Sequence, residues 1–374
     1  MKFIESFPIK TDYTVVRSRS PLRISFCGGG TDVPPYPEQF GGCVLSCTID
    51  KYAYVSIRPY VNRQIHVISE DQGLDVHFAP NGGENLEGRL DIAQAIFRRF
   101  STSGLEFHIT ADAPPGSGLG SSSSMIVALI EALSRENGIT LSKYQKAELA
   151  FQIERNDLGI VGGMQDQYAA AFGGFNFIEF EKNGVYVTPL RCSTELLSEL
   201  HYHLLLVYTG NTRLSSNILA EQTANVLHQR EKVMDSLAGM KELTHSLKRA
   251  FLKGRLLDFG QFLDEAWTLK RNLASAISNA HIEELYDTAK SAGAIGGKIL
   301  GAGGGGHLLL FAPFNRRAKV RQAMEAAGAR IVDFQFEDQG ATSWLTTEET
   351  WAPAIPTSPP QLSGTERTLV QARS

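Results

Sequence analysis

The spacing of hydrophobic and polar residues predicts a strand-rich first third of the chain and a helix-rich remainder. Runs rich in β-branched and aromatic residues, bounded by Gly, Pro and Asn, are typical of strands. These runs cover residues 14–19, 23–27, 43–58, 64–69 and 105–111. Apolar residues at helical spacing then predict helices over residues 121–136 and 142–155.

The second half alternates between strand-like and helical patterns. Further strands are expected at residues 174–180, 185–189, 201–209, 307–311 and 330–336. Helical patterns cover residues 216–280, 282–292 and 316–328. The longest of these should break near Gly239 and Gly254, because glycine weakens a helix interior.

The length of 374 residues predicts about two domains. We place residues 1–195 in the first domain and residues 196–350 in the second. Residues 351–374 combine four prolines with Ser and Thr, so we expect a disordered tail there.

Charge and cysteine content exclude several classes of protein. Lys and Arg number 36 against 40 acidic residues, a net charge of −4 that gives no sign of a nucleic-acid partner. The first ten residues lack the apolar core of a signal peptide. No run approaches the roughly twenty apolar residues that span a bilayer, so no membrane partner is expected. The four cysteines are expected to be free thiols in a cytoplasmic protein.

The most distinctive motif is a loop of glycines and serines that leads into a helix. It reads Pro114-Pro115-Gly116-Ser117-Gly118-Leu119-Gly120-Ser121-Ser122-Ser123-Ser124. Unpaired amides and the positive end of the helix dipole favour an anion at such a site. A Walker loop is excluded because the motif has no lysine, and the glycine spacing does not match the dinucleotide fingerprint. A serine-rich helix cap is the alternative, but the alternating glycines lead us to favour phosphate binding.

Two further glycine clusters lie near the two ends of the chain. The first, Gly28-Gly29-Gly30-Thr31-Asp32, follows a strand. Asp32 could accept hydrogen bonds from a polyol or cap the turn, and both interpretations stay open. The second covers residues 296–306 and meets the dinucleotide pattern, but a strand follows it where a helix is needed. A loop that approaches a ligand or packs under the phosphate site fits better.

A carboxylate among small and apolar residues is the fourth feature. Asp166 follows Gly162-Gly163. It either works as a base with a tuned pKa or caps a helix that starts at Gln167. Glu154, at the end of the preceding helical pattern, is a candidate magnesium ligand.

Other candidate sites are less well supported. His201 and His203 alternate on the expected strand, which is a metal-ligand spacing, but no third ligand is evident. Ser117 has no visible His and Asp partners, so a hydrolase triad is excluded.

Together and in this order, the clusters resemble the GHMP kinases, a superfamily named for galacto-, homoserine, mevalonate and phosphomevalonate kinases. The superfamily signature Pro-x-x-x-Gly-Leu-Gly-Ser-Ser is matched by residues 114–122. The early and late motifs resemble residues 21–32 and 298–306, and the resemblance covers residues 14–347. Within the superfamily, residues 28–32, 154–168, 172–177 and 333–344 are similar to the kinases of heptose 7-phosphates.

The resemblance implies a two-domain α+β fold with ATP bound between the domains. The N-terminal domain would be like ribosomal protein S5 and the C-terminal domain ferredoxin-like. The ATP phosphates would be held by Pro115, Gly116, Ser117, Gly118, Leu119, Gly120, Ser121, Ser122 and Ser123.

The resemblance also implies roles for residues outside the loop. Ser122 and Glu154 would coordinate magnesium. Asp166 would lie beside the acceptor hydroxyl, with Arg23 next to it to neutralise charge in the transition state. The sugar would be bound by Asp32, Thr31, Gly30, Gly303 and Gly304.

The implied reaction moves the γ-phosphoryl group of ATP to the anomeric hydroxyl of D-glycero-D-manno-heptose 7-phosphate. The 1,7-bisphosphate would serve the synthesis of nucleotide-activated heptose. The expected partners are the phosphorylated sugar and ATP, and a homodimer stays open. The substrate phosphate needs basic residues, for which the candidates are Arg17, Arg19, Lys51, Arg155 and Arg213.

Two alternatives remain at this stage. One is a fucokinase or galactokinase of the same fold. The other is a catalytically silent ATP and sugar sensor, which should have lost Ser122, Glu154 or Asp166, and all three are present.

Overall fold

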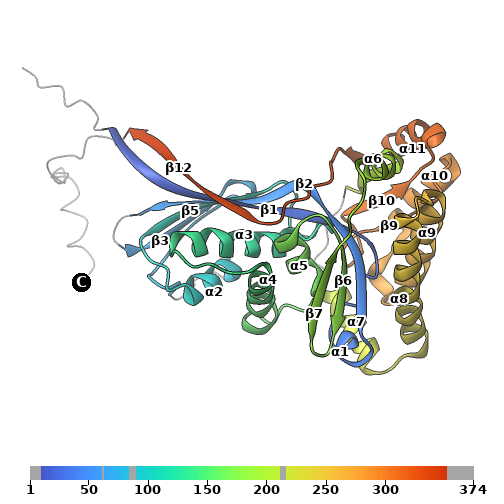
Figure 1. Cartoon of the computed structure of the whole chain (residues 1–374), viewed down its shortest axis with the longest axis horizontal. Coiled ribbons are helices and arrows are strands. Elements are labelled where there is room, and N and C mark those ends of the chain that lie inside the picture. Colours follow the sequence, from blue (N-terminus) through green and yellow to red (C-terminus); the bar gives the residue numbers. More distant parts are fainter. Residues whose placement is uncertain (1–9, 61–62, 84–89, 211–215, 352–374) are drawn as a thin grey trace, which may run out of the picture.

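Two β-sheets with helices packed against them make up the computed structural model, which describes residues 10–60, 63–83, 90–210 and 216–351 (Figure 1). Most strand pairs are antiparallel, and β3 and β5 form a parallel pair. The helices are segregated to the faces of the sheets, which confirms the expected α+β class.

Among the described residues, eight strands form the larger sheet, in the order β12-β1-β2-β5-β3-β4 with β6 between β2 and β7. They are β1 (Lys10–Cys27), β2 (Gly42–Pro59), β3 (Ile65–Ser69), β4 (Leu74–Phe78), β5 (Leu105–Ala111), β6 (Phe175–Glu181), β7 (Gly184–Pro189) and β12 (Thr342–Trp351). The sequence predicts two separate strands where β1 runs unbroken. The register of β1 against β2 shifts at Pro21, which has no amide hydrogen for the ladder.

Helices cover one face of this sheet (Figure 1). They are α2 (Asp91–Arg99), α3 (Ser121–Glu136), α4 (Lys143–Phe151) and α5 (Gln165–Phe172). Their apolar sides and the sheet share one core, in which Phe97, Phe107 and Ile130 are fully buried. The central helix α3 is buried along most of its length, so its N-terminus has a fixed position.

The second sheet has four strands within the part of the chain that the structure describes, in the order β11-β8-β10-β9. They are β8 (Leu204–Tyr208), β9 (Gly296–Ile299), β10 (His307–Phe311) and β11 (Arg330–Val332). The helices that surround it are α6 (Thr194–His203), α7 (Ser216–Leu227), α8 (Glu231–Leu252), α9 (Leu256–Arg271), α10 (Ala280–Ala292) and α11 (Phe314–Ala326). No helix in the described ranges has both the length and the apolar character to cross a bilayer.

An aromatic cluster joins the two halves of the molecule. Phe26 of β1 stacks on Phe175 of β6, with ring centroids 5.6 Å apart, and meets Phe259 of α9 edge-on. Phe175 also stacks on Phe251 of α8 at 5.0 Å. Because this core contains residues from both halves, it holds the loops at their junction in a defined arrangement.

The expected strand over residues 201–209 is wrong in its first part. His201 and His203 lie in the last turn of α6, and β8 begins only at Leu204. The hydroxyl of Ser193 accepts the amide of Leu196 and so caps the start of this helix. The two histidines therefore do not alternate on a strand.

The expected helix break near Gly239 is also wrong, because α8 continues through it. A Cβ at Gly239 would approach only the side chain of Leu269, at 3.5 Å, so glycine there lies in the contact with α9. The break near Gly254 is confirmed: α8 ends at Leu252 and α9 begins at Leu256.

The last strand returns to the first sheet. β12 pairs with β1 along its length, and the two extend together beyond the helices (Figure 1). The division at residues 195 and 196 stays a proposal, and this pairing argues for placing residues 342–351 with the first domain. The expected disordered tail falls on residues 352–374, outside the described ranges.

Candidate active site

A cavity of about 290 Å³ lies at the N-terminus of α3. Gly116, Gly118 and Gly120 before it have φ angles of 78°, 81° and 78°, a region that glycine adopts without strain. Gly120 is the N-cap, and no side chain caps the helix. The amides of the first turn have no intrahelical acceptor and are available to an anion.

Most residues of the predicted phosphate loop line this cavity. They are Pro115, Gly116, Ser117, Gly118, Gly120, Ser121, Ser122 and Ser123. Leu119 does not line the cavity, because its side chain is buried in the core between the two halves. The hydroxyl of Ser117 is buried without a hydrogen-bond partner among the described residues, which leaves it available to a ligand.

The four serines that begin α3 differ in what their hydroxyls bind. Three donate to protein groups: Ser121 to the Ala113 carbonyl at 2.6 Å, Ser123 to Glu154 at 2.8 Å and Ser124 to the Pro21 carbonyl at 2.9 Å. Within the described residues, the Ser122 hydroxyl has no such partner, and Ser122 lines the cavity. Ser122 is therefore the serine of the run that is free to bind a ligand.

An ion pair between Arg23 and Asp166 forms the floor of the cavity. Arg23 Nε donates to Asp166 Oδ1 at 2.7 Å, and Nη2 lies 2.7 Å from the same oxygen in an ion pair. Arg23 Nη1 donates to the carbonyl of Gly118 at 2.5 Å, which ties the pair to the phosphate loop. The side chain of Asp166 is 22% exposed. Since both contacts with Arg23 are made by Oδ1, Asp166 Oδ2 keeps its lone pairs for a ligand in the cavity.

The phosphate loop approaches this pair closely at one glycine. A Cβ on Gly120 would lie 3.3 Å from Asp166 and 3.4 Å from Arg23. Asp166 lies in the first turn of α5, which begins at Gln165 with Met164 as its N-cap. The alternative in which Asp166 caps a helix that starts at Gln167 is therefore wrong. The two predicted catalytic residues are thus adjacent and next to the loop.

Glu154 lies beside the same loop, in a π-helical turn over Gln152–Asp157. Its Oε2 accepts hydrogen bonds from Ser123 at 2.8 Å and Gln167 at 2.6 Å. Burial raises the pKa of the Glu154 carboxyl, and the nearby charge of Asp166 raises it further. A divalent cation would offset the burial of this charge. The carboxylate and the free Ser122 hydroxyl therefore fit the oxygen ligands that magnesium takes.

Asp32 is fully buried in the cavity wall, and both of its carboxylate oxygens accept hydrogen bonds from protein groups. Its Oδ1 accepts the amide of Gly30 at 2.9 Å. Its Oδ2 accepts the backbone and side-chain amides of Gln165, both at 3.1 Å. Burial raises the pKa of Asp32. Asp32 thus does cap its turn, and it also lies next to the cavity.

The other predicted sugar-side residues divide into two groups. Gly30 and Gly303 line the cavity. Thr31 lies behind the wall, where its hydroxyl donates to the Gly28 carbonyl at 2.8 Å and accepts the Cys43 amide at 3.1 Å. Gly304 also lies behind it, with its amide on the Ile277 carbonyl at 2.8 Å. We therefore do not place Thr31 or Gly304 among the lining residues.

The late glycine loop packs directly against the phosphate loop. A Cβ on Gly301 would lie 2.6 Å from Gly118 Cα, and a Cβ on Gly306 would lie 2.4 Å from the Ser117 carbonyl oxygen. The backbone amide of His307 also donates to that oxygen, at 3.1 Å. Glycines are required here because two backbones are in contact.

Two buried lysines lie behind the cavity, and the sequence analysis assigned a role to neither. Lys298 donates to the Ser25 carbonyl at 2.8 Å, and Lys270 donates to the Gly301 carbonyl. Burial lowers the pKa of Lys298 to about 8 and lowers that of Lys270 well below its usual value. The only sequence feature that could have indicated their burial is the position of each lysine within an apolar pattern. With Arg23, Lys298 places positive charge behind a site suited to anions at pH values below about 8.

The candidate cations for a substrate phosphate lie in different places. Arg17 pairs with Glu348 on the β1–β12 ribbon, Arg19 covers the ring of Tyr52, and Lys51 lies near Asp50. Arg213 lies outside the described residues. Arg155 lines the cavity and donates to the carbonyls of Ile160 and Gly163 at 3.1 and 3.0 Å.

A second cavity of about 300 Å³ adjoins the first. Pro115, Ser121 and Ser122 line both. Its walls are mostly apolar and include Ile92, Ala93, Ile109, Met125, Leu129 and Ile160. An apolar cleft beside an anion site suits a ligand with a flat ring system and a phosphate chain.

Comparison with known families and curated proteins gives consistent matches. Residues 89–174 match the GHMP kinases N terminal domain, and residues 247–330 match the GHMP kinases C terminal domain. The chain is 34% identical to a D-glycero-alpha-D-manno-heptose 7-phosphate kinase of Campylobacter jejuni, over 88% of this chain and 98% of that protein. It is 29% identical to a bifunctional fucokinase/GDP-fucose pyrophosphorylase of Arabidopsis thaliana, over 82% of this chain and 30% of that protein.

Solved structures agree with these matches. A D-glycero-D-manno-heptose 1-phosphate kinase from Bacteroides thetaiotaomicron superposes with a TM-score of 0.74 and 32% identity, over 88% of this chain and 98% of that one. A structure from Campylobacter jejuni that is described as a sugar kinase superposes with a TM-score of 0.73 and 32% identity. The match covers 89% of this chain and 98% of that one. Since relatives above 30% identity match over nearly their whole length, the chain belongs to the GHMP kinase family, and its chemistry is that of a kinase.

Proposed function

We propose that the protein transfers the γ-phosphoryl group of ATP to the anomeric hydroxyl of D-glycero-D-manno-heptose 7-phosphate. The observation that carries the reaction is the free oxygen of Asp166, which shares a cavity with the uncapped N-terminus of α3. The choice of a heptose is supported by two relatives whose names specify heptose phosphates. The 1,7-bisphosphate product would supply nucleotide-activated heptose in the cytoplasm, where ATP is available.

The donor would extend across both cavities. The apolar cavity would take the adenine ring, and the phosphates would lie on the loop and the first turn of α3. This placement is supported by the five residues common to both cavities, which are Ile92, Pro115, Ser121, Ser122 and Ile160. Ser117 and the first-turn amides would donate hydrogen bonds to the phosphate oxygens.

The acceptor sugar would lie beside Asp32 and Asp166. Asp166 Oδ2 would accept a hydrogen bond from the acceptor hydroxyl, and so orient it and receive its proton as the oxygen attacks. Arg23, held by the same carboxylate, would stabilise the negative charge of the transferred group. The buried Lys298 behind the wall would add to this positive potential, at pH values below about 8, without touching the substrate.

Ser122 and Glu154 would hold a magnesium ion, which when bound neutralises charge on the phosphate oxygens. Glu154 is oriented for this task by Ser123 and Gln167, which both donate to its Oε2. Its Oε1 lies 3.4 Å from the guanidinium of Arg155. The Ser122 hydroxyl needs no rearrangement, because no described residue accepts its hydrogen bond.

The distal phosphate of the sugar would be bound by Arg155. Of the four candidate cations in the described ranges, Arg155 is the one that lines the cavity. The backbone of Gly162 and Gly163 separates it from Asp32: a Cβ on Gly162 would meet the Arg155 guanidinium, and one on Gly163 would meet Asp32. The guanidinium of Arg155 and the carboxylate of Asp32 therefore lie on opposite sides of the Gly162–Gly163 backbone.

Release of ADP, measured with ATP and magnesium across a panel of sugars, tests the proposal. The panel contains heptose 7-phosphate, heptose 1-phosphate, unphosphorylated heptose, fucose and galactose. Turnover with heptose 7-phosphate alone, and a product phosphorylated at the anomeric position, is the expected result. Turnover with heptose 1-phosphate or with a free sugar would replace the proposed substrate. Tight ATP binding without any turnover would favour a sensor.

The role of Arg155 has its own test in Arg155→Gln. We expect the KM for heptose 7-phosphate to rise by about 10- to 100-fold, because a charge-assisted hydrogen bond contributes ~1.5–3 kcal/mol. The KM for ATP should stay within about threefold, a change of well under 1 kcal/mol. An equal rise in both constants would mean that Arg155 acts by ordering its loop or through its ion pair with Glu154, and not by binding the sugar phosphate.

A further inference from the structure

A cluster of two histidines and one carboxylate lies on the β3–β4 hairpin, at the edge of the larger sheet, next to Glu106 of the neighbouring strand β5. His66 on β3 is directly opposite His77 on β4, and Asp75 lies two positions before His77 on the same face. One ligand atom from each of these three side chains lies within 4.8 Å of the others. None of the three lines either cavity of the active site.

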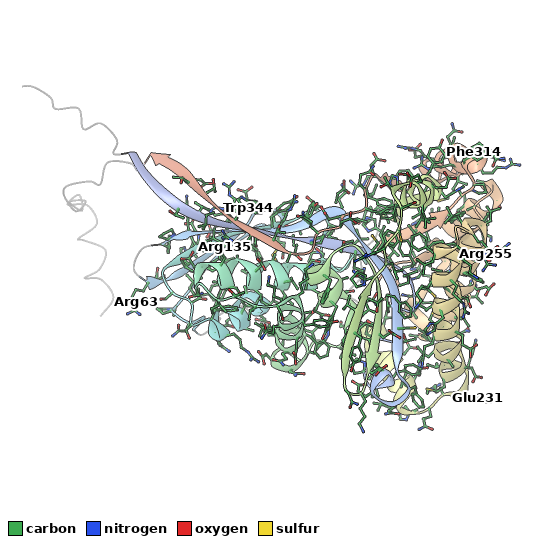
Figure 2. All side chains as sticks on the ribbon, viewed as in Figure 1. Arg63, Arg135, Glu231, Arg255, Phe314 and Trp344 are labelled. Atoms are coloured by element: carbon green, nitrogen blue, oxygen red, sulfur yellow. The ribbon has the colours of Figure 1, made fainter. Side chains whose placement is uncertain are left out.

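This hairpin is far from the second half of the molecule. Figure 2 shows Arg63, which precedes β3, at one end of the long axis, whereas Arg255 and Phe314 lie toward the other end. The cluster therefore lies away from the junction between the halves, and the part of the hairpin that reaches the second cavity is Gln72, in the connection between β3 and β4.

Both ring nitrogens of His66 face carboxylates. Nδ1 lies 3.1 Å from Glu106 Oε2, and Nε2 lies 2.7 Å from Asp75 Oδ1. A neutral imidazole has one N–H group, so it can donate to only one of the two. The other contact then brings two lone pairs together, unless a proton or a metal ion joins them.

The surroundings indicate which nitrogen faces the cation. Glu106 is fixed by Arg58, whose Nε donates to Oε1 at 2.6 Å, and by His108 at 2.8 Å. This anchored carboxylate is the better acceptor for the Nδ1–H group of His66. A carboxylate that holds the second nitrogen of a histidine is the usual support of a metal-binding imidazole. The lone pair of His66 Nε2 then faces Asp75.

His77 adds a second nitrogen donor at the same place. Its ring stacks on that of His66, with centroids 4.2 Å apart and planes 6° from parallel. Asp75 and His77 are both exposed, so their side chains can turn toward a shared ion without disturbing the core.

We propose that His66, Asp75 and His77 bind a divalent transition-metal ion of the zinc class, with Glu106 as the supporting carboxylate. Two imidazoles and one carboxylate form a donor set that suits zinc and not magnesium, which prefers oxygen ligands. Because the ligands lie on both strands, the ion would hold the β3–β4 hairpin together. It would bind the folded chain more tightly than the unfolded one and raise the thermal midpoint.

Titration of the chelator-treated full-length protein with zinc ions, by calorimetry, tests this proposal. Excess magnesium is present so that the oxygen ligands of the active site are occupied. We expect one zinc ion per chain, bound at least tenfold more weakly by His77→Ala and by Asp75→Asn. The thermal midpoint should rise with zinc in the parent protein and stay unchanged in His77→Ala. The matched control is His228→Ala, which removes an exposed histidine at the end of α7 and should bind zinc like the parent.

Three results would overturn the proposal. One is the absence of zinc binding by the parent protein. The second is equal affinity in the parent and in His77→Ala, whose unchanged circular dichroism would show that it is folded. The third comes from nitrogen NMR: both nitrogens of His66 protonated in the presence of zinc would mean that a proton, and not a metal ion, joins His66 to Asp75.

Discussion

At the scale of single residues, the hydrogen-bond partners of each carboxylate decide what it can do. Asp166 uses one oxygen for Arg23 and leaves the other open to the cavity. Asp32 uses both oxygens for amides of the protein, so its part in ligand binding is limited to the lone pairs that remain. Glu154 has neutral donors on Oε2, which orient it, and the guanidinium of Arg155 lies 3.4 Å from its Oε1. Three acids around one cavity thus have three different capacities.

Asp166→Asn tests the open oxygen. An amide cannot accept the proton of the attacking hydroxyl, so kcat should fall by about 10²- to 10⁴-fold, the usual contribution of a general base. The Kd for ATP should change little, since the loop and α3 are untouched. Steady-state kinetics and calorimetry measure the two constants. The control Asp287→Asn, at an exposed position on α10, should have parent kinetics, and unchanged turnover in Asp166→Asn would remove this residue from catalysis.

Ser122→Ala and Ser124→Ala form a matched pair of neighbouring substitutions. Ser124→Ala leaves the buried carbonyl of Pro21 without its donor and should lower the unfolding free energy by ~1–3 kcal/mol. Ser122→Ala breaks no such bond and should stay within about 0.5 kcal/mol of the parent. It should instead raise the magnesium concentration needed for half-maximal rate by about tenfold or more.

Urea unfolding and magnesium-dependent kinetics separate the two effects. If Ser122→Ala lost stability and kept its magnesium dependence, the serine would be a structural residue. If Ser124→Ala altered the magnesium dependence at parent stability, the assignment of the two hydroxyls would be reversed.

At the scale of elements, the site depends on two glycine loops in direct backbone contact. The phosphate loop belongs to the first sheet and the late loop to the second, and Gly118 and Gly301 touch where they cross. The carbonyl of Gly301 also accepts from Lys270 of α9. The position of the phosphate loop therefore depends on an element more than 150 positions away in the chain.

Gly301→Ala tests this contact, with Gly328→Ala as its control. Both glycines have positive φ, 65° and 83°, so alanine should cost ~1–2 kcal/mol of strain at either site. A Cβ at Gly328 meets open space, whereas at Gly301 it would lie 2.6 Å from Gly118 Cα. Gly301→Ala should therefore lose ~1–3 kcal/mol more than its control and bind ATP more weakly.

Urea unfolding and ATP calorimetry on both variants measure the difference. Equal losses of stability, with parent ATP affinity in each, would show that the contact between the loops does not position the phosphate site.

At the scale of the whole molecule, the junction of the two halves combines an apolar core with buried cations. The aromatic cluster around Phe26 supplies the packing. Next to it, Lys298 of β9 donates to the Ser25 carbonyl of β1, a bond between the two sheets. A buried ammonium group destabilises the fold unless an opposite charge or hydrogen-bond acceptors lie near it. Here the ammonium group lies behind a site for anionic ligands.

The lowered pKa of Lys298 predicts how stability changes with pH. Between pH 8 and pH 10.5 the folded chain has lost this proton and the unfolded chain still binds it, so the free energy of unfolding rises with pH. Lys298→Met removes this pH-dependent contribution to the free energy of unfolding. The parent should therefore gain about 2 kcal/mol relative to Lys298→Met between pH 7.5 and pH 10.

Urea unfolding of both proteins at the two pH values measures this gain, and the other titrating groups cancel in the difference. The exposed Lys319→Met is the control and should show no relative change. A parent-to-Lys298→Met difference that is the same at both pH values would contradict the lowered pKa.

Much of the local structure could be predicted from sequence patterns. The helix over 121–136 and the strand over 105–111 are observed with the expected bounds, because their apolar periodicity is clear. His201 and His203 were misplaced, since the cap at Ser193 outweighs the strand-like composition after it. The pairing of Arg23 with Asp166, 143 positions apart, had no local signal and was expected only through the resemblance to a family.

The sequence by itself determined the glycine-rich phosphate loop, the helix that follows it, and the presence of carboxylates at two glycine turns. These features depend on backbone conformations and apolar spacing, which neighbouring residues set. Only the tertiary structure decided which serine hydroxyl stays free, which oxygens of Asp32 and Asp166 are occupied, and which lysines lie behind the site. Those outcomes depend on hydrogen bonds between residues far apart in the chain, and such partners meet only when the two sheets pack together.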